Sequence, residues 1–367
     1  MKTNNSSKQP SQKQTHINLR KLAQHLGLSQ TTVSRVVNQS PGAARISPQT
    51  RDRVMEAAAT LNYKPSVLAR SLRSKHSMIV SVIVPEISEG YSTAVLSGIE
   101  EALLLAGYFY FVVSHRHRRE LLRDYPSLLV SRAVEGIIAV DSAIEGDVPV
   151  PVVSVSGHHR RTSGVNIELD HTLAARYALE HLKCLGHTRI AFMQGQTFSS
   201  DTLPRWRAIV KVAAELGIEV HPRLTVQLNE FGGGFEPGRV AALELLERDE
   251  DFTAIFAFND HAAIGAIAAL REAGLEVPSQ VSVIGFDDIP SAAIHSPALT
   301  TVSQPLQEMG RVAAAELLQM LRSETVEQPA RTIHVLPRFI ERQSTAIASH
   351  LRKTGAEPVL IRPARER

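Results

Sequence analysis

The amino-acid sequence predicts an all-α helix-turn-helix head followed by a larger α/β body, and three observations support this fold class. Two short amphipathic helices meet at Gly27, near the start of the 367-residue chain. Basic residues are concentrated in the same region. From Met78 onward, apolar strand-like runs alternate with amphipathic helices, which is typical of parallel sheets covered by helices on both faces.

The helix pair occupies residues 22–38. Each helix has an apolar stripe that can pack against the other, so the polar residues face outward. The stripes consist of Leu22, Ala23 and Leu26 on the first helix and of Val33, Val36 and Val37 on the second. Such a unit is either a DNA-binding helix-turn-helix or an ordinary helical hairpin with a solvated face.

The polar face of the second helix carries side chains that can read DNA bases. Ser29 is expected to cap this helix, whose N-terminal residues contact base edges in the major groove when such a unit binds DNA. Arg can hold guanine, and Gln can hold adenine, through two hydrogen bonds each. Gln30, Thr31 and Arg35 are therefore the expected base-reading residues.

The distribution of charge favours the DNA-binding interpretation. Residues 1–76 contain thirteen Lys and Arg but only two acidic residues, Asp52 and Glu56, which gives a net charge of +11. The whole chain has 40 basic and 37 acidic residues, so the remainder has 27 and 35 and a net charge of −8. A polycationic end gains affinity for DNA because it releases counterions from the phosphates.

A third helix is expected over residues 47–63, because Ser47 can cap it and Pro48 suits its first turn. It would close a small core with the helix pair. After Pro65, residues 66–74 have the length of a two-turn helix, which is too short to be stable alone. That segment would need DNA or a partner chain to fold.

Together these segments resemble the lactose-repressor (LacI/GalR) family of transcription regulators, through residues 32–38, 50–51, 62–65 and 69–72. In that family the short segment is a hinge helix that pairs with its dimer mate in the minor groove, where a leucine is wedged into a base step. Leu72 occupies that position, and such a wedge bends the duplex. The alternative is that Leu72 covers the body of the chain. The DNA-binding residues that the motifs and the resemblance imply are Asn18, Ser29, Gln30, Thr31, Thr32, Ser34, Arg35, Asn38, Tyr63, Ala69 and Leu72.

The strands and helices of the body are expected from their apolar patterns. The strand candidates are residues 79–85, 108–114, 136–140, 150–155, 189–194, 224–228, 254–258 and 282–285. Helix candidates are residues 93–105, 172–185, 204–216, 239–248 and 262–273. Folds of this kind bind ligands beyond the carboxyl ends of their strands.

The body resembles the periplasmic-binding-protein-like effector domain of the same family, through residues 134–138, 186–187, 256–260, 277–278, 281–288 and 297–302. This resemblance implies two doubly wound lobes, three crossings of the chain between them, and an effector in the cleft. The implied organisation is a disordered leader at 1–15, a helix-turn-helix domain at 16–64, a hinge helix or linker at 65–76, an effector-binding and dimerisation domain at 77–345 and a flexible tail at 346–367. Within the effector domain, residues 77–172 and 303–330 form the N-terminal lobe, and residues 173–302 and 331–345 form the C-terminal lobe.

Arg205, Asn259 and Asp287 match positions that contact the effector in sugar-responsive members of the family. An Arg, an amide and a carboxylate offer donors and acceptors to several hydroxyl groups, which suits a sugar or another polyol. For Asp287 the alternative role is to cap a turn after a strand. Further candidates for the effector site, whose aromatic members could equally belong to the core, are Ser156, Tyr91, Phe256 and Trp206.

Departures from the family pattern bear on the chemistry of the effector. Ser156 and Leu169 stand where sugar-responsive members commonly have Asp, and the same lobe has basic loops at 115–119 and 158–161. If those loops border the cleft, they favour an acidic effector such as a sugar acid or a sugar phosphate; otherwise they are solvated. The segment 40–46 is longer than in the best-known members, which would change contacts with the DNA backbone but not groove entry.

Other chemistries have little support in the sequence. The glycines at 232–234 lack the spacing of a phosphate-binding loop, and His181, Cys184 and His187 are too few for structural zinc. No set of nucleophile, base and acid stands out, so we expect no catalytic residue, metal or cofactor. Cys184 is the single cysteine, and no apolar segment is long enough to target or span a membrane.

We therefore expect a cytoplasmic, non-enzymatic transcription regulator, and we favour a repressor. It is expected to bind a palindromic operator as a homodimer and to respond to a sugar or sugar derivative. Dimer contacts should come from the effector domain, in particular its N-terminal lobe, because the tail has no heptad repeat. A solute-binding protein would need a signal peptide and would not carry the basic head. An α/β enzyme would need a catalytic set at its strand ends, and a regulator with a non-sugar effector is the remaining alternative.

Overall fold

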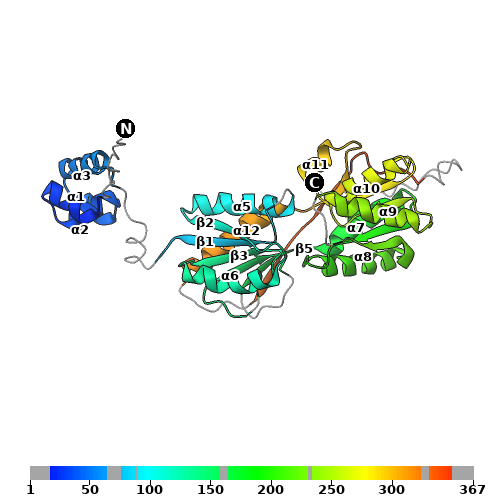
Figure 1. Ribbon diagram of the computed structural model, residues 1–367, viewed down its shortest axis with the longest axis horizontal. Helices are drawn as coiled ribbons and strands as arrows, with labels where there is room; N and C mark the ends of the chain where they lie inside the picture. Colours follow the sequence, from blue (N-terminus) through cyan, green and yellow to red (C-terminus); the bar gives the residue numbers. More distant parts are fainter. Residues whose placement is uncertain are drawn as a thin grey trace, which may run out of the picture. The chain divides into compact units, whose positions relative to one another are not determined.

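The computed structural model describes residues 17–63, 76–87, 90–144, 146–157, 164–229, 234–323 and 330–348. The chain divides into two compact units, a head (Met1–Ser77) and a body (Met78–Arg367), which are shown in Figure 1. The expected leader, the hinge helix with Ala69 and Leu72, and the basic loop at 158–161 lie outside the described residues.

The described part of the head contains α1 (Leu19–Leu26), α2 (Gln30–Val37), the 3-10 helix η1 (Pro41–Arg45) and α3 (Pro48–Thr60). Gly27 ends α1 with a left-handed φ of 64°. Ser29 caps α2, since its side chain accepts a hydrogen bond from the backbone N of Thr32 at 3.1 Å. The apolar stripes of α1 and α2 meet α3 in a core of Leu22, Ala23, Val33, Val36, Val54 and Ala58. The predicted helix-turn-helix is therefore confirmed.

The first sheet of the body is parallel throughout, with the order β11-β5-β4-β3-β1-β2. Its strands are β1 (Ile79–Val84), β2 (Phe109–Ser114), β3 (Gly136–Val140), β4 (Val152–Val155), β5 (Val165–Leu169) and β11 (Arg331–Val335). The helices α5 (Tyr91–Leu105) and α12 (Leu306–Arg322) pack on one face, and α6 (Arg119–Ser131) packs on the other (Figure 1). We call this sheet with its helices the N-lobe.

The second sheet has the order β12-β10-β9-β8-β6-β7, and its edge strand β12 is antiparallel to β10. Its strands are β6 (Ile190–Gln194), β7 (Thr225–Gln227), β8 (Ala254–Phe256), β9 (Ser282–Asp287), β10 (Thr300–Ser303) and β12 (Arg338–Ile340). The helices α9 (Glu236–Glu247) and α10 (Asp260–Glu272) cover one face, and α7 (His171–Cys184) and α8 (Thr202–Leu216) cover the other. This sheet, its helices and the short helices η2 (Pro222–Leu224) and α11 (Pro290–Ile294) form the C-lobe.

The chain crosses between the lobes after β5, after β10 and after β11, so the expected two-lobed body is confirmed. Two expected boundaries were wrong. Residues 331–335 form β11, which pairs with β5 in the N-lobe, so the last crossing follows Val335. The tail begins later than residue 346, because the backbone N of Ala348 donates to Leu185 O at 2.9 Å and ties this segment to α7.

No helix in the described ranges combines the length and the apolar character of a membrane span.

Candidate functional site

A cavity of about 520 Å³ lies between the lobes, where strands of both sheets end. The N-lobe contributes residues that follow β1, β2 and β3, and the C-lobe contributes residues that follow β6, β7, β8 and β9. The polar and aromatic lining consists of Glu86, Tyr91, Ser92, Arg116, His117 and Asp141 from the N-lobe and of Gln196, Phe198, Ser199, Asp201, Arg205, Phe235, Phe258, Asn259, His261 and Asp287 from the C-lobe. A cavity of this size can enclose a small molecule.

Arg205, on the first turn of α8, is the buried cation of the cavity. Its side chain donates to Phe258 O at 2.6 Å and to Asp201 Oδ2 at 3.1 Å. The guanidinium also lies over the rings of Phe286 and Phe258, at 3.8 and 4.4 Å from their centroids. Its Nε is buried and has no hydrogen-bond partner among the described residues.

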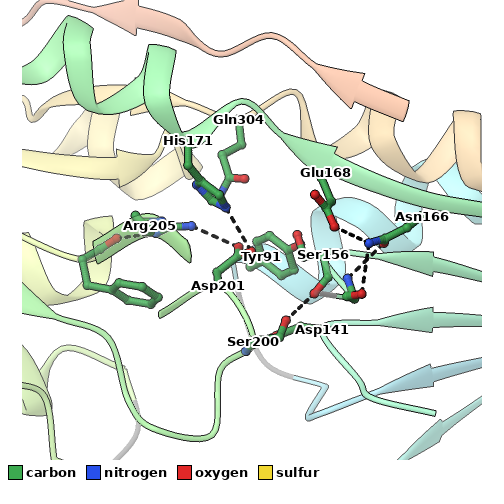
Figure 2. A network of polar contacts seen from close by, with 12 residues as sticks. Tyr91, Asp141, Ser156, Asn166, Glu168, His171, Ser200, Asp201, Arg205 and Gln304 are labelled. Carbon is green, nitrogen blue, oxygen red and sulfur yellow. Dashed lines mark hydrogen bonds and ion pairs between the residues drawn. The ribbon is translucent and has the colours of Figure 1, made fainter. Parts of the chain in front are cut away.

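Asp201 links Arg205 to the start of α7. Its Oδ1 lies 3.3 Å from Nε2 of His171, while its Oδ2 accepts from Arg205 (Figure 2). Asp201 is 4% exposed and Arg205 is 3% exposed. The carboxylate therefore fixes the guanidinium in one orientation at the wall of the cavity.

Asp287, at the end of β9, is a second acidic group of the C-lobe wall. Its backbone has a φ of 110°, and its Oδ1 accepts a hydrogen bond from Nε2 of Gln304 at 2.6 Å. Burial raises the pKa of Asp287 to about 7, although the Arg205 charge acts in the opposite direction. Near neutral pH this carboxyl group therefore occurs both in its protonated form, which can donate a hydrogen bond, and in its ionised form, which can only accept one.

A contact between the lobes lies beside this acidic group. Ser200, in the loop before α8, donates from its backbone N and its Oγ to Asp141 Oδ1, at 2.8 and 2.5 Å. The same hydroxyl also reaches Ser156 O, at the end of β4. Burial and the nearby Asp201 raise the pKa of Asp141 to about 7. A C-lobe loop is therefore attached to the strand ends of the N-lobe (Figure 2).

Tyr91 and Ser156 form a hydrogen bond on the N-lobe side. The Tyr91 hydroxyl donates to Ser156 Oγ at 2.7 Å, and burial holds the pKa of Tyr91 well above its ordinary value. Tyr91 lines the cavity, whereas Ser156 is buried behind it. Ser156 thus supports the wall of the cavity through its hydrogen bond with Tyr91.

The remaining candidates for the effector site divide between the cavity and the core. Asn259 lines the cavity, but its side chain accepts from Ala262 N at 2.8 Å and caps α10. Phe256 is 2% exposed and packs in the C-lobe core beside Phe192, which is the alternative to a place in the cleft that the sequence left open for this ring. Trp206 packs against the same core.

Asp141 and Asp201 are two of the cavity residues that the sequence patterns did not indicate. Asp141 directly follows a confirmed strand, and the rule that ligands bind beyond the carboxyl ends of strands could have identified it. Asp201 is four residues before Arg205, which places both side chains on one face of a helix end.

One of the two basic loops borders the cavity. Arg116 and His117 adopt left-handed φ values of 47° and 58° and line the cavity. The ring of His117 lies 3.7 Å from that of Phe198 on the C-lobe, measured between centroids. Arg116 of this loop therefore places a positive charge at the N-lobe wall of the cavity.

The DNA-binding candidates of the head include both exposed side chains and side chains with structural roles. Gln30, Thr31 and Arg35 are exposed on α2, as base-reading residues must be. The other candidates among the described residues also have structural roles. Asn18 and Ser29 cap helices, and Thr32 Oγ1 lies at hydrogen-bond distance, 2.8 Å, from Ser29 Oγ. The Asn38 side chain donates to the backbone carbonyl of the buried Ser34, and Tyr63 packs on the core.

The described residues contain no group of three or more His, Cys, Asp or Glu side chains that could hold a metal ion.

Comparison with known proteins gives matches to both parts of the chain. Residues 18–66 match the family described as bacterial regulatory proteins, lacI family, and residues 179–345 match a periplasmic binding protein-like domain. The HTH-type transcriptional repressor PurR of Erwinia tasmaniensis is 31% identical over 343 residues, which cover 89% of this chain and 96% of that protein.

Solved structures agree with these matches. The Lac repressor dimer bound to operator and the anti-inducer ONPF has a TM-score of 0.81 at 25% identity, over 90% of this chain and 99% of that one. The complex of the transcriptional regulator CelR with cellobiose has a TM-score of 0.66 at 25% identity, over 90% and 100% of the two chains. The chain therefore belongs to the lacI family of bacterial regulatory proteins, a family of regulators rather than enzymes, and is a DNA-binding transcriptional repressor with a periplasmic-binding-protein-like effector domain.

Proposed function

We propose that this repressor binds a palindromic operator as a homodimer, reads it with the exposed face of α2, and is controlled by a neutral sugar or sugar derivative in the interlobe cavity. LacI-family repressors bind operator DNA as dimers with small-molecule effectors. The observation that carries the choice of effector is the grouping of Arg205 with three carboxyl groups, those of Asp141, Asp201 and Asp287, around one cavity.

This set of groups suits a ligand with many hydroxyls. Carboxylates accept hydrogen bonds from hydroxyl groups, and a guanidinium donates to hydroxyl or ring oxygens. The rings of Tyr91, Phe198 and Phe258 line the same cavity and can pack on the apolar face of a sugar ring. The cellobiose complex of CelR, a structural relative, supports a saccharide. Asp141 and Asp201 also supply the acidic groups that are missing at Ser156 and Leu169.

An anionic effector, such as a sugar acid or a sugar phosphate, is the second candidate, because Arg116 and His117 line the cavity. The charge balance is against it. Arg205 is already paired with Asp201, Glu86 balances the charge of Arg116, and Asp141 and Asp287 add further negative charge as they ionise near pH 7. A neutral ligand avoids the repulsion that an anion would meet there.

Control of DNA binding requires that the effector favour one arrangement of the lobes, and its differential affinity limits the change in operator affinity. The loop that carries Asp201 also carries Ser200, whose hydrogen bonds join the lobes. A ligand that moves Asp201 therefore acts on the contact between the lobes.

The first prediction is that neutral sugars stabilise the full-length protein in a thermal-shift screen that also contains sugar acids, sugar phosphates and nucleobases. At about 100 times its dissociation constant, a ligand adds roughly 2.7 kcal/mol of stability. The shift should disappear in Arg205→Ala and persist in Arg176→Ala, a change at a partly exposed arginine of α7. Stabilisation by phosphates or nucleobases alone would contradict the proposed class of effector.

The second prediction concerns the operator. Arg35→Ala should lower affinity for an operator selected from palindromic DNA by about 1–3 kcal/mol and relax the preference at one base pair of each half-site. Competition binding against single-base-pair variants measures this preference. If Arg35→Ala weakens binding to all variants equally, Arg35 contacts the DNA backbone and is not a base reader.

A further inference from the structure

The segment that follows α2 turns back on this helix through a defined cap. Gln39 has a left-handed φ of 49°, and its backbone N donates to Val36 O at 3.0 Å. The backbone N of Ser40 donates to Arg35 O at 3.0 Å, which completes a Schellman motif. η1 follows at once, and its buried Ala43 anchors it to the head.

This turn brings the backbone of Gly42 against the side chain of Arg35. A Cβ atom placed on Gly42 would lie 3.2 Å from Cδ, 3.3 Å from Nε and 3.6 Å from Cζ of Arg35. The end of the arginine side chain therefore lies across a surface that has no side chain of its own. Gly42 has no left-handed φ, in contrast to Gly27, so its backbone conformation does not require glycine.

The guanidinium of Arg35 is available for a contact outside the head. Arg35 is exposed on α2, and within the described ranges its side chain makes no hydrogen bond or ion pair. Because Gly42 has no side chain, it leaves open the space beside Cδ and Nε of Arg35, and a Cβ at this position would displace the arginine side chain by a few tenths of an ångström.

We propose that Gly42 is a positioning residue for operator recognition. Because Gly42 has no side chain, the Arg35 side chain can lie against η1, and this placement sets the direction of the guanidinium and so the base preference of α2. The proposal rests on the proposed role of Arg35 as a base reader. A bidentate contact with a base needs the planar fork in one orientation, and a few tenths of an ångström decide whether both hydrogen bonds form.

The test uses the full-length protein and an operator selected from a library of palindromic DNA. Discrimination is the ratio of dissociation constants for each single-base-pair variant and the selected operator. It is measured for the native chain, Gly42→Ala, Gly42→Val, Arg35→Ala and the double variant Arg35→Ala/Gly42→Val. Loss of the guanidinium should reduce discrimination about 5- to 150-fold at the base pair that it reads.

We expect Gly42→Val to reduce discrimination about 3- to 10-fold at that same base pair, and Gly42→Ala to do so less, with the other positions unchanged. In the Arg35→Ala background, Gly42→Val should add nothing, because the two residues act as one unit. Ala44→Val, at an exposed position of the same 3-10 helix, is the matched control and should leave every ratio unchanged. Melting temperatures exclude a loss of folding, and Gly42→Ala should not lower them.

Three results overturn the inference alone. In the first, Arg35→Ala loses discrimination but Gly42→Val does not. In the second, Gly42→Val has the same effect with and without Arg35. In the third, Gly42→Val has an equal effect at every base pair. If Arg35→Ala retains full discrimination, the proposed base-reading role of Arg35 fails, and this inference fails with it.

Discussion

At the scale of single residues, Arg205 shows how the cavity is built. Its guanidinium is enclosed by two aromatic rings, a backbone carbonyl and the carboxylate of Asp201, and the residue is 3% exposed. A buried ion pair of this kind adds little net stability, because both charges lose their hydration. Its contribution is geometric, since it fixes donors and acceptors at the wall before a ligand arrives.

The third prediction is that Arg205→Ala lowers the free energy of unfolding by about 3–5 kcal/mol, because it removes the buried cation that is paired with the Asp201 carboxylate. Urea denaturation at neutral pH measures the change. Arg176→Ala removes an exposed pair with Glu215 and should cost little. Comparable small losses in the two variants would show that the Arg205 pair is solvated and would remove the argument for a prearranged site.

At the residue scale, the family resemblance implied two positions that the structure places at the cavity wall. Arg205 and Asp287 were expected at the cavity and line it. Phe256 and Phe258 were both assigned to one strand, but β8 ends at Phe256, so Phe256 packs in the core and Phe258 reaches the cavity. Strand ends cannot be read to within two residues from an apolar run, and this error decides which ring meets the ligand.

At the scale of elements, apolar periodicity identified the buried strands but not the elements that depend on distant packing. α6 contains Pro126, which in a sequence signals the end of a helix. α12 returns to the first sheet and crosses α5 closely: a Cβ on Gly98 would lie 1.9 Å from Gln307 O. No local pattern specifies that crossing, and only the family resemblance implied the return. β11 is a partly exposed edge strand, so its apolar signal is weak.

The loop before α8 is the element that joins the two lobes beside the cavity. Ser200 has a single hydroxyl proton, but two acceptors, Asp141 Oδ1 and Ser156 O, lie within its reach. A protonated Asp141 can donate to Ser200 Oγ, and the Ser200 proton is then free for Ser156 O. The interlobe contact is therefore fully satisfied when Asp141 carries a proton, in accord with its raised pKa.

The fourth prediction is that Asp141→Asn makes stability less dependent on pH. Because burial and Asp201 raise the pKa of Asp141 from 3.8 to about 7, its contribution is complete below pH 3.8 and is lost as the pH rises through about 7. The contribution is at most about 4 kcal/mol. Asp287, whose pKa is also raised to about 7, loses its own contribution in the same range, so part of the pH dependence should remain.

Free energies of unfolding at pH 5 and pH 8 test this prediction. The native chain should be less stable at pH 8, and the difference between the two values should be smaller in Asp141→Asn. Asp124→Asn, at an exposed aspartate of α6, should retain the native difference. Equal differences in all three proteins would mean that Asp141 is ionised throughout this range and does not regulate the contact between the lobes.

At the scale of the whole molecule, the sequence separates two roles by charge. The first 76 residues carry a net charge of +11 and the remainder carries −8. An acidic body is repelled by DNA phosphates, so we expect the DNA contacts to come from the first 76 residues. In the proposed homodimer, the two heads would then be held together by contacts between the bodies.

Exposed apolar residues favour the N-lobe as the place of those contacts. Leu105, at the end of α5, is 84% exposed, and Phe109, the first residue of β2, is 66% exposed. Both lie next to the open edge of the first sheet, because β2 is its outermost strand. An edge strand with neighbouring apolar side chains is a surface that another chain can cover.

The fifth prediction is that Leu105→Glu and Phe109→Lys each shift the protein from dimer to monomer in sedimentation velocity experiments, because a charge would be buried in the interface. Operator affinity should fall in parallel, since two linked heads bind two half-sites far more tightly than separate heads do. Ile294→Glu, at an equally exposed apolar residue of α11 in the C-lobe, is the matched control and should leave the dimer intact. Dissociation by Ile294→Glu but not by the N-lobe variants would place the interface on the C-lobe. In that case Leu105 and Phe109 would be exposed to solvent at the edge of the first sheet. The effector would then act on the spacing of the two heads through the C-lobe.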